Sequence, residues 1–172
     1  MTALTYRDAG PADAARLAEL GRRSFTETFG HLYRPEDLAA FLVNHAEDNW
    51  RRELADPAFA IRVGEAGGEP VAYLKLGPPS LPVEAERPAL ELRQLYVLKP
   101  WHGTGAADAL MRWAIAEAAR RGARDLYLSV FVDNGRARRF YERYGFTFVR
   151  PYAFVVGSHA DEDHIMRLSL ED

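Results

Sequence analysis

The chain has 172 residues, of which 48% are hydrophobic and 27% are charged, and its formal net charge is −3. This composition is typical of a globular domain, and the negative net charge argues against a nucleic-acid-binding protein, whose surface is usually basic. The chain contains no cysteine, which excludes a disulfide scaffold, a zinc–thiolate site and a cysteine nucleophile. No apolar run approaches the ~18 residues of a membrane helix, and the N-terminus lacks a signal-peptide pattern. We therefore expect one cytoplasmic domain over residues 1–172, without a membrane or nucleic-acid partner.

The first half of the chain predicts a short strand, two helices and a hairpin. The segment 11–13, Pro-Ala-Asp, begins a helix whose apolar positions recur on one face, at Ala14, Leu17, Ala18, Gly21 and Phe25. Pro35 begins a second helix that runs to Asp56, with acidic residues in its first turn, as the helix dipole favours. The predicted strands of this half, where the apolar pattern alternates, are Leu4–Arg7, Phe59–Glu65 and Pro70–Leu76.

The second half predicts strands that alternate with two helices. It begins with the proline-rich loop 77–88. One helix follows Gly103 and Gly105 and ends at Gly122, and a shorter helix covers Asn134–Tyr144. The predicted strands are Ala89–Leu98, Asp125–Val132, Phe146–Val155 and His164–Leu170. The order β-α-α-β-β-β-α-β-α-β-β predicts an α/β protein of the α+β type, with a mixed sheet flanked by helices.

The stretch WHGTGAADALM, residues 101–111, places two glycines directly before a helix. The first N–H groups of a helix have no internal partners and carry partial positive charge, so such a turn can hold a phosphate. The same pattern also fits a plain strand-to-helix turn. No lysine follows the glycines, which excludes a P-loop, and Asp108 stands where a dinucleotide fingerprint requires a small residue.

Two motifs resemble those of the GNAT superfamily of N-acetyltransferases. Residues 102–107, HGTGAA, are similar to the signature that cradles the pyrophosphate of acetyl-coenzyme A, and LYVLKPWHG resembles the fourth strand that leads into it. The superfamily spacing Asn-x-x-Ala-x-x-x-Tyr-x-x-x-Gly-Phe falls on Asn134, Ala137, Tyr141, Gly145 and Phe146. The resemblance implies the GNAT fold, with a mostly antiparallel sheet of six to seven strands and about four helices, and acetyl-CoA as cosubstrate without a metal. Segments such as RRSFTETFGHL and DEDHIMRLSL further resemble the bacterial spermidine/spermine (PaiA-like) branch.

The resemblance also implies which residues hold the cosubstrate. Backbone amides of the glycine turn would bind the pyrophosphate, and the backbone of the fourth strand would polarise the thioester carbonyl. The superfamily's Gln or Arg is replaced by His102, so we expect a weaker or pH-dependent contact there, or a surface histidine without a contact. The expected binding residues are Leu95, Tyr96, Val97, His102, Gly103, Thr104, Gly105, Ala106, Ala107, Asn134, Ala137 and Tyr141.

Acetyl transfer to an amine also needs an acid for the leaving thiolate and a base for the ammonium. Tyr141 is the expected acid, because a phenol is protonated at neutral pH; the alternative is a core aromatic residue. Glu91 is the candidate base, with a water chain, a backbone carbonyl or a plain solvated charge as alternatives. We place Glu91 on the same strand face as Leu95 and Val97. The helix arginines Arg136, Arg138 and Arg139 are candidates for contact with the cosubstrate's 3′-phosphate.

The acceptor is expected between the first two helices and the loop 77–88. Phe29, His31 and Tyr33 are the candidate substrate residues. Acidic residues of the two helices suit a polyamine or another cationic amine, although we favour a solvated helix face as their explanation. The stretch HADEDH, residues 159–164, mixes imidazoles and carboxylates, and we interpret it as a solvent-facing turn, not a metal site.

Three functions remain open from the sequence: a small-molecule amine acetyltransferase, a protein or peptide N-acetyltransferase, and a non-catalytic acetyl-CoA-binding module. The first is our prediction. The sequence is compatible with a homodimer but does not specify the oligomeric state.

Overall fold

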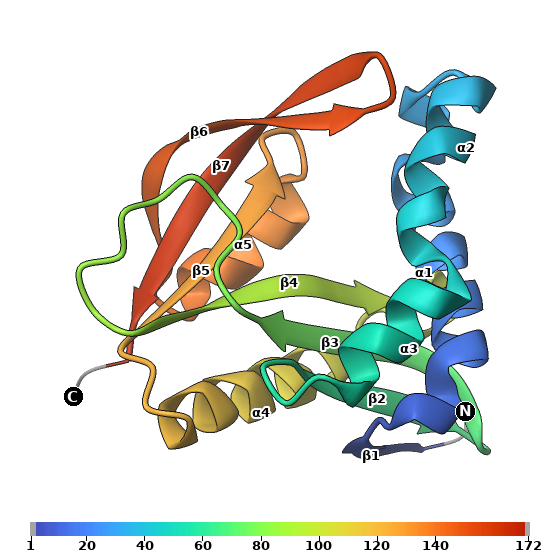
Figure 1. The fold of residues 1–172 in the computed structure, drawn as a ribbon, viewed down its shortest axis with the longest axis horizontal. Coiled ribbons are helices and arrows are strands. Elements are labelled where there is room, and N and C mark those ends of the chain that lie inside the picture. Colours follow the sequence, from blue (N-terminus) through green and yellow to red (C-terminus); the bar gives the residue numbers. More distant parts are fainter. Residues whose placement is uncertain (1–2, 171–172) are drawn as a thin grey trace.

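The computed structural model describes residues 3–170, so the outermost residues of the expected domain lie outside it. It contains a seven-stranded sheet in the order β1-β2-β3-β4-β5-β7-β6 (Figure 1). Strands β4 and β5 are parallel and every other neighbouring pair is antiparallel, which confirms the predicted mixed, mostly antiparallel sheet. The strands are β1 (Leu4–Asp8), β2 (Ala60–Ala66), β3 (Glu69–Gly77), β4 (Ala89–Val97), β5 (Asp125–Phe131), β6 (Thr147–Val156) and β7 (His159–Ser169).

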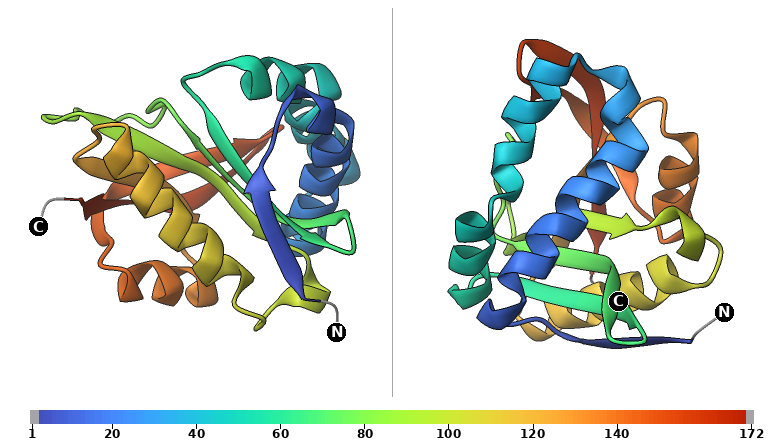
Figure 2. Two further views of the ribbon diagram at one scale, coloured as in Figure 1. Left: turned by 90° about the horizontal axis from the view of Figure 1, so that it is seen from below. Right: turned by 90° about the vertical axis from the view of Figure 1, so that its right-hand side faces the viewer.

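Helices cover both faces of the sheet (Figure 2). One face carries α1 (Ala14–Phe29), α2 (Pro35–Leu42) and α3 (Glu47–Ala55); the other carries α4 (Ala106–Arg120) and α5 (Gly135–Arg143). Each face has its own apolar core. Leu17 and Trp50 are fully buried on the α1 side, and Leu110 and Met111 are fully buried on the α4 side. The sheet therefore separates two hydrophobic cores, one on each of its faces.

The predicted second helix is wrong in one respect, because the structure divides it into α2 and α3. A 3-10 turn, Val43–His45, follows α2, and Ala46 then adopts an extended backbone with ψ of 147°. The break buries the His45 ring, which lies between the rings of Phe41 and Trp50 and against Gly21. The segment holds neither proline nor glycine, so the sequence carries no local signal for this break.

The predicted strand face of Glu91 is wrong, because β4 contains a β-bulge. Gln94 is the partner of Lys75 and Leu92 is the partner of Leu76, so Arg93 is an extra residue in β4. The extra residue shifts the alternation of side chains by one position. Leu92 consequently packs in the α4 core together with Leu95, and Glu91 lies on the opposite face, which faces α1.

The strand β7 also differs from its prediction, because it begins at His159, five residues earlier than expected. The stretch 159–164 is thus paired strand, and the turn between β6 and β7 is at Gly157 and Ser158. The interpretation of this stretch as a solvent-facing turn is wrong, since Asp163 is 5% exposed. Within the described residues, no group of three His, Cys, Asp or Glu side chains is arranged to hold a metal ion.

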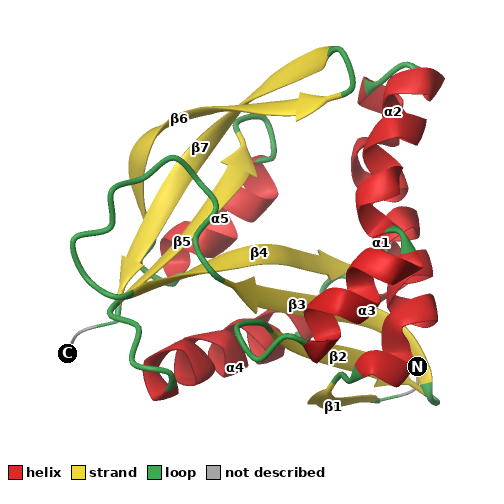
Figure 3. Cartoon of the chain, in the orientation of Figure 1, coloured by secondary structure: helices red, strands yellow, loops and turns green. Residues whose placement is uncertain are grey.

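The predicted loop is irregular over residues 78–88, whereas Gly77 is the last residue of β3, and the loop runs across the sheet towards β6 (Figure 3). Arg150 of β6 donates a hydrogen bond of 3.1 Å to the Pro82 carbonyl. Between residues 3 and 170, none of the helices combines the length and the apolar character needed to cross a membrane.

Candidate active site

Strands β4 and β5 separate partway along their length. Their pairing is confined to residues 89–91 of β4 and 125–127 of β5, after which the strands diverge (Figure 1). A cavity of about 590 Å³ fills this divergence and is lined from both faces of the sheet. Gly103, Gly105 and residues of α5 line it from one side, and Phe25, Phe29 and Tyr33 line it from the other. Two reactants could therefore enter from opposite faces and meet between the strands.

The cavity gathers almost all of the predicted cosubstrate residues. Thr104 is the exception, because its hydroxyl donates a 2.6 Å hydrogen bond to the Trp101 carbonyl and thereby closes the turn. The lining residues from the predicted set are Leu95, Tyr96, Val97, His102, Gly103, Gly105, Ala106, Ala107, Asn134, Ala137 and Tyr141.

The glycine turn has the geometry of an anion cradle. Gly103 and Gly105 have φ of 77° and 86°, which side chains with a Cβ rarely adopt. No atom lies within 4 Å of the position of an added Cβ at either glycine, so the backbone borders open space. Gly105 is the N-cap of α4 and has no side chain that could satisfy the first N–H groups of the helix. These amides are thus available to a phosphate that enters the cavity.

His102 lies between the end of β4 and α5. Its Nε2 is 2.7 Å from the Val97 carbonyl oxygen, and its Nδ1 is 2.7 Å from Nη1 of Arg136. A guanidinium can only donate, so Nδ1 accepts and the ring proton is on Nε2. His102 therefore bridges the two elements that flank the cavity.

The helix α5 presents three kinds of group to the cavity. Asn134 is the N-cap, and its side chain accepts a 3.3 Å hydrogen bond from the Ala137 amide, so the capping function is confirmed. Tyr141 is buried and lines the cavity, and burial raises the pKa of its phenol. Among the arginines, Arg138 instead donates to the Val132 carbonyl. The α5 arginines that line the cavity are Arg136, Arg139 and Arg143, of which the sequence analysis missed the last; Arg93 of β4 also lines it.

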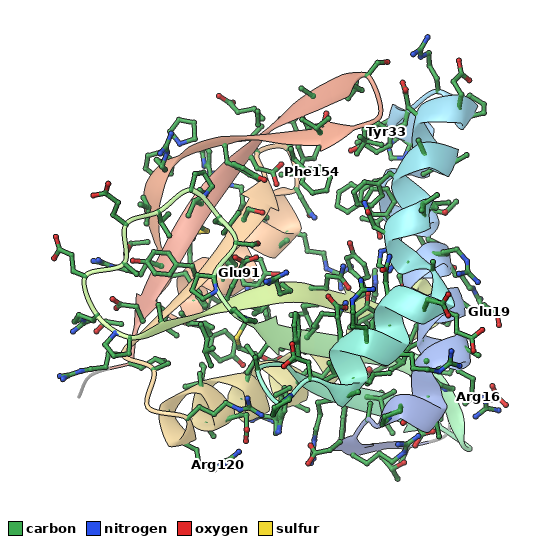
Figure 4. All side chains as sticks on the ribbon, in the orientation of Figure 1. Arg16, Glu19, Tyr33, Glu91, Arg120 and Phe154 are labelled. Atoms are coloured by element: carbon green, nitrogen blue, oxygen red, sulfur yellow. The ribbon has the colours of Figure 1, made fainter. Side chains whose placement is uncertain are left out.

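On the α1 side, two of the three predicted substrate residues reach the cavity. Phe29 and Tyr33 line it, whereas His31 is exposed and is not part of the lining. Figure 4 shows Tyr33 and Phe154 turned into the space between the helical segment and the β6–β7 hairpin. The Tyr33 hydroxyl donates a hydrogen bond to Asp161 of β7, so this side of the cavity is closed by contacts between elements far apart in sequence.

Glu91, the predicted base, does not line the cavity. Its carboxylate accepts hydrogen bonds from the Ser80 amide (2.7 Å), the Ser80 hydroxyl (3.1 Å) and the Leu81 amide (3.1 Å). Arg93 lies 3.6 Å from the same carboxylate. Glu91 therefore anchors the loop before β4, where Figure 4 labels it far from Tyr33. The loop likewise contributes no lining residue, so this cavity does not support the predicted acceptor position beside the loop.

Two carboxylates of β7 line the cavity and were missed from the sequence. Asp161 and Asp163 lie on the same strand face as Ile165, which is fully buried. Burial raises the pKa of Asp163 to about 7, the neighbouring Asp161 carboxylate adds to this, and a hydrogen bond with Ser129 opposes it. The period of two in Asp161-x-Asp163-x-Ile165 is the signal that could have placed both carboxylates on an inward face.

The family model described as "Acetyltransferase (GNAT) family" matches residues 15–146. The chain belongs to the GNAT family of acetyltransferases. It is accordingly an acetyl-CoA-dependent N-acetyltransferase, as the sequence motifs predict.

Relatives in sequence and in structure are also N-acetyltransferases or share their fold. An uncharacterised N-acetyltransferase of Mycobacterium bovis is 35% identical over 155 residues, which cover 90% of this chain and 96% of the relative. PaiA N-acetyltransferase from Thermoplasma acidophilum, solved in complex with coenzyme A, has a TM-score of 0.77 at 17% identity, over 97% of this chain and 99% of that one. The yncA protein of Salmonella typhimurium, solved with acetyl-CoA, has a TM-score of 0.71 at 22% identity over 99% and 96% of the two chains. The two solved structures share the fold.

The acetyltransferase cavity fits acetyl-CoA in its chemistry. The amides of the glycine turn and the arginines of α5 would balance the negative charge of the phosphates of acetyl-CoA. The gap between β4 and β5 would admit its extended, amide-containing pantetheine arm. Bound acetyl-CoA supplies the acetyl group as a thioester. The protein supplies the positions of the reacting groups and the protons that they exchange.

Proposed function

We propose that this N-acetyltransferase acetylates the primary amine of a small cationic molecule, for which a polyamine is the candidate. The observation that carries the proposal is the closed acceptor side of the cavity. Arg34 and Asp37 both bond to Ser158 at the tip of the β6–β7 hairpin, with distances of 2.6 Å and 3.0 Å. Together with the bond between Tyr33 and Asp161, these contacts join the N-terminal helical segment to the hairpin on the acceptor side, where an extended peptide would require an open groove. A small molecule needs no such open groove.

The charge and character of the acceptor side support a cationic substrate. Asp161 and Asp163 provide carboxylates, and the aromatic side chains around them offer ring faces to an alkyl chain or an ammonium group. The aromatic residues of this side are Phe25, Phe29, Tyr33, Phe131 and Phe154.

For the cosubstrate side, we assign the pyrophosphate to the amides at residues 103–107 and the thioester carbonyl to the β4 backbone at residues 95–97. Asn134 would contact the pantetheine arm. Arg139 and Arg143 would face the 3′-phosphate, since both line the cavity from α5. Tyr141 would give its proton to the departing sulfur, because its raised pKa keeps the phenol protonated until a thiolate forms beside it.

The experiment is steady-state release of coenzyme A from acetyl-CoA with a panel of amines that includes spermidine. We expect turnover with cationic amines and a decrease of kcat by about 10²-fold in Tyr141→Phe, the size of a lost general acid. Tyr127→Phe is the matched control, because Tyr127 is a buried tyrosine of β5 outside the cavity lining. Bound acetyl-CoA without transfer to any amine would contradict the enzyme assignment, whereas equal rates in Tyr141→Phe would contradict only the role of Tyr141.

Three broader expectations from the sequence are also proposals: one domain over residues 1–172, action in the cytoplasm and a homodimer. The single sheet that includes every described strand supports the first, and a chain without cysteine suits a reducing compartment. Sedimentation velocity of the purified chain tests the homodimer.

A further inference from the structure

The acceptor ammonium must lose a proton before its nitrogen can attack the thioester carbonyl. Among the described residues that line the cavity, four side chains carry a carboxylate or an imidazole that could take this proton: Asp108, Asp161, Asp163 and His102. A primary ammonium has a pKa of about 10.4, so without such a group it would remain protonated and unreactive. The contacts of these four groups distinguish them.

Two of the four lie at the cosubstrate end of the cavity. Asp108 is in the first turn of α4, where it accepts a 2.6 Å hydrogen bond from the Tyr144 hydroxyl. His102 is next to the glycine turn, and both of its ring nitrogens are engaged, by Val97 and Arg136. Neither is placed to meet an amine that enters from the α1 side.

The other two lie on the acceptor side and differ in their partners. Asp161 accepts the hydrogen bond of Tyr33, and its Oδ1 is 2.9 Å from Nε2 of His159. It therefore joins the β6–β7 hairpin to the segment after α1. Asp163 is two residues further along β7, 5% exposed, with its side chain on the same face and in the cavity lining.

Asp163 is also close to the gap between the strands. Burial raises the pKa of the Tyr96 phenol, and Tyr141 and the Asp163 carboxylate add to this rise. Asp163, Tyr96 and Tyr141 line the same cavity, from β7, β4 and α5 respectively. An amine held beside Asp163 would therefore share this cavity with a thioester held beside Tyr141.

We propose that Asp163 is the general base of the acetyl transfer, which rests on the proposed function of amine acetylation. Asp163 takes one proton from the acceptor ammonium. The nitrogen lone pair then forms a bond to the thioester carbonyl carbon, and the carbon–sulfur bond breaks with its electron pair on sulfur. Tyr141 gives its proton to that sulfur and recovers the second nitrogen proton. The products are an N-acetyl amine, the coenzyme A thiol and one proton, which Asp163 returns to solvent.

The surroundings of Asp163 fit a base that works near neutral pH. The titratable groups that face it are Asp161 on its own strand, Tyr33 after α1, Tyr96 on β4 and Tyr152, its paired residue on β6. Ser129 of β5 supplies a hydroxyl. With burial and a second carboxylate opposing its charge, the pKa of Asp163 is about 7, where a general base combines availability with basicity.

The test compares the pH dependence of kcat/KM for wild type and Asp163→Asn, with spermidine as the amine. We expect the variant to be about 10²-fold slower at pH 8, and the ratio of the two rates to fall as the pH decreases through about 7. The ionisation of the amine itself is common to both enzymes and cancels in this ratio. Glu162→Gln is the matched control, because Glu162 is exposed on the opposite face of β7 and should retain wild-type rates.

Coenzyme A titration by calorimetry establishes that each variant is folded. A ratio near one, or a ratio that does not change with pH, would overturn the assignment of Asp163 while the enzyme still acetylates the amine. Wild type that binds coenzyme A but acetylates no amine would overturn the proposed function and the assignment with it. If Asp163→Asn does not fold, the pH dependence of kcat/KM for the wild type decides. A wild-type kcat/KM that shows no ionisation near pH 7 would contradict the proposal.

Discussion

Asp163 shows how one residue can contribute to a site at a cost to the fold. A carboxylate that is 5% exposed, beside a second carboxylate, is disfavoured in its charged form, which is why its pKa rises from 3.8 to about 7. A group whose pKa is raised on folding contributes stability below its unfolded pKa and loses it as the pH rises through the folded value. Wild type should therefore lose stability at this residue between about pH 4 and pH 7.

Asp163→Asn is expected to be more stable than wild type above pH 7. The rise in the pKa of Asp163 from 3.8 to about 7 corresponds to at most about 4 kcal/mol, and partial contact with water in the cavity reduces this to about 1–2 kcal/mol. Urea unfolding at pH 5 and pH 8 measures the free energy of unfolding of both proteins. The difference in the free energy of unfolding, variant minus wild type, should grow from pH 5 to pH 8. A difference that is equal at both pH values would contradict the claim that Asp163 becomes charged while buried.

At the scale of elements, the turn from β4 into α4 joins a backbone conformation to an anion site. Gly105 has φ of 86° and no neighbouring atom that would exclude a Cβ, so steric crowding does not explain the glycine. Gly68, in the turn between β2 and β3, has φ of 85° and is equally uncrowded. The two glycines differ in their place in the fold, because only Gly105 lines the cavity.

This pair predicts that Gly105→Ala and Gly68→Ala destabilise the enzyme by a similar amount, about 1–2 kcal/mol for a side chain in the left-handed region. Only Gly105→Ala should weaken coenzyme A binding, by about tenfold or more, because its Cβ would extend into the space expected for the pyrophosphate. Calorimetric titration with coenzyme A measures this. Unchanged affinity in Gly105→Ala would exclude the glycine turn as the phosphate cradle.

The extent to which the sequence predicted this site follows from how local each signal is. The glycine turn and the α5 motif are written in consecutive residues, so their elements were predicted correctly, and most of the residues predicted to bind the cosubstrate line the cavity. The position of Glu91 depends on the extra residue Arg93 in β4, which appears only in the register against β3. Asp163 was missed because the strand was expected to begin at His164, whereas the turn at Gly157 and Ser158 and the pairing with β6 place its start at His159.

At the scale of the whole molecule, a clamp between the N-terminal helices and the C-terminal hairpin closes the acceptor side. The Asp37 carboxylate accepts hydrogen bonds from the Ser158 amide and hydroxyl, and Arg34 donates to both Asp37 and Ser158. The Arg34 guanidinium and the Ser158 amide lower the pKa of Asp37 to about 2. The clamp is therefore charged, and retained, throughout the neutral range. Figure 1 shows the hairpin reaching α2 at this point.

Gly157→Ala is expected to open this clamp. An added Cβ at Gly157 would lie 2.3 Å from Oδ1 and 2.8 Å from Cα of Asp37, so the hairpin must move away from α2. The KM for the amine should rise about tenfold, a loss of 1.4 kcal/mol, with unchanged coenzyme A affinity. Gly67→Ala is the control, because Gly67 has φ of 57° against 59° for Gly157 but borders open space. An amine KM equal to that of the control would show that the clamp does not shape the acceptor site.

The central claim, that this enzyme acetylates a small cationic amine, is tested most directly by competition. Wild-type enzyme receives acetyl-CoA with an equimolar mixture of spermidine, a neutral-chain monoamine and a peptide with a free N-terminus, and mass spectrometry identifies the acetylated product. A closed acceptor side with Asp161 and Asp163 predicts acetyl-spermidine as the main product, followed by the monoamine. Preferential acetylation of the peptide would contradict the account.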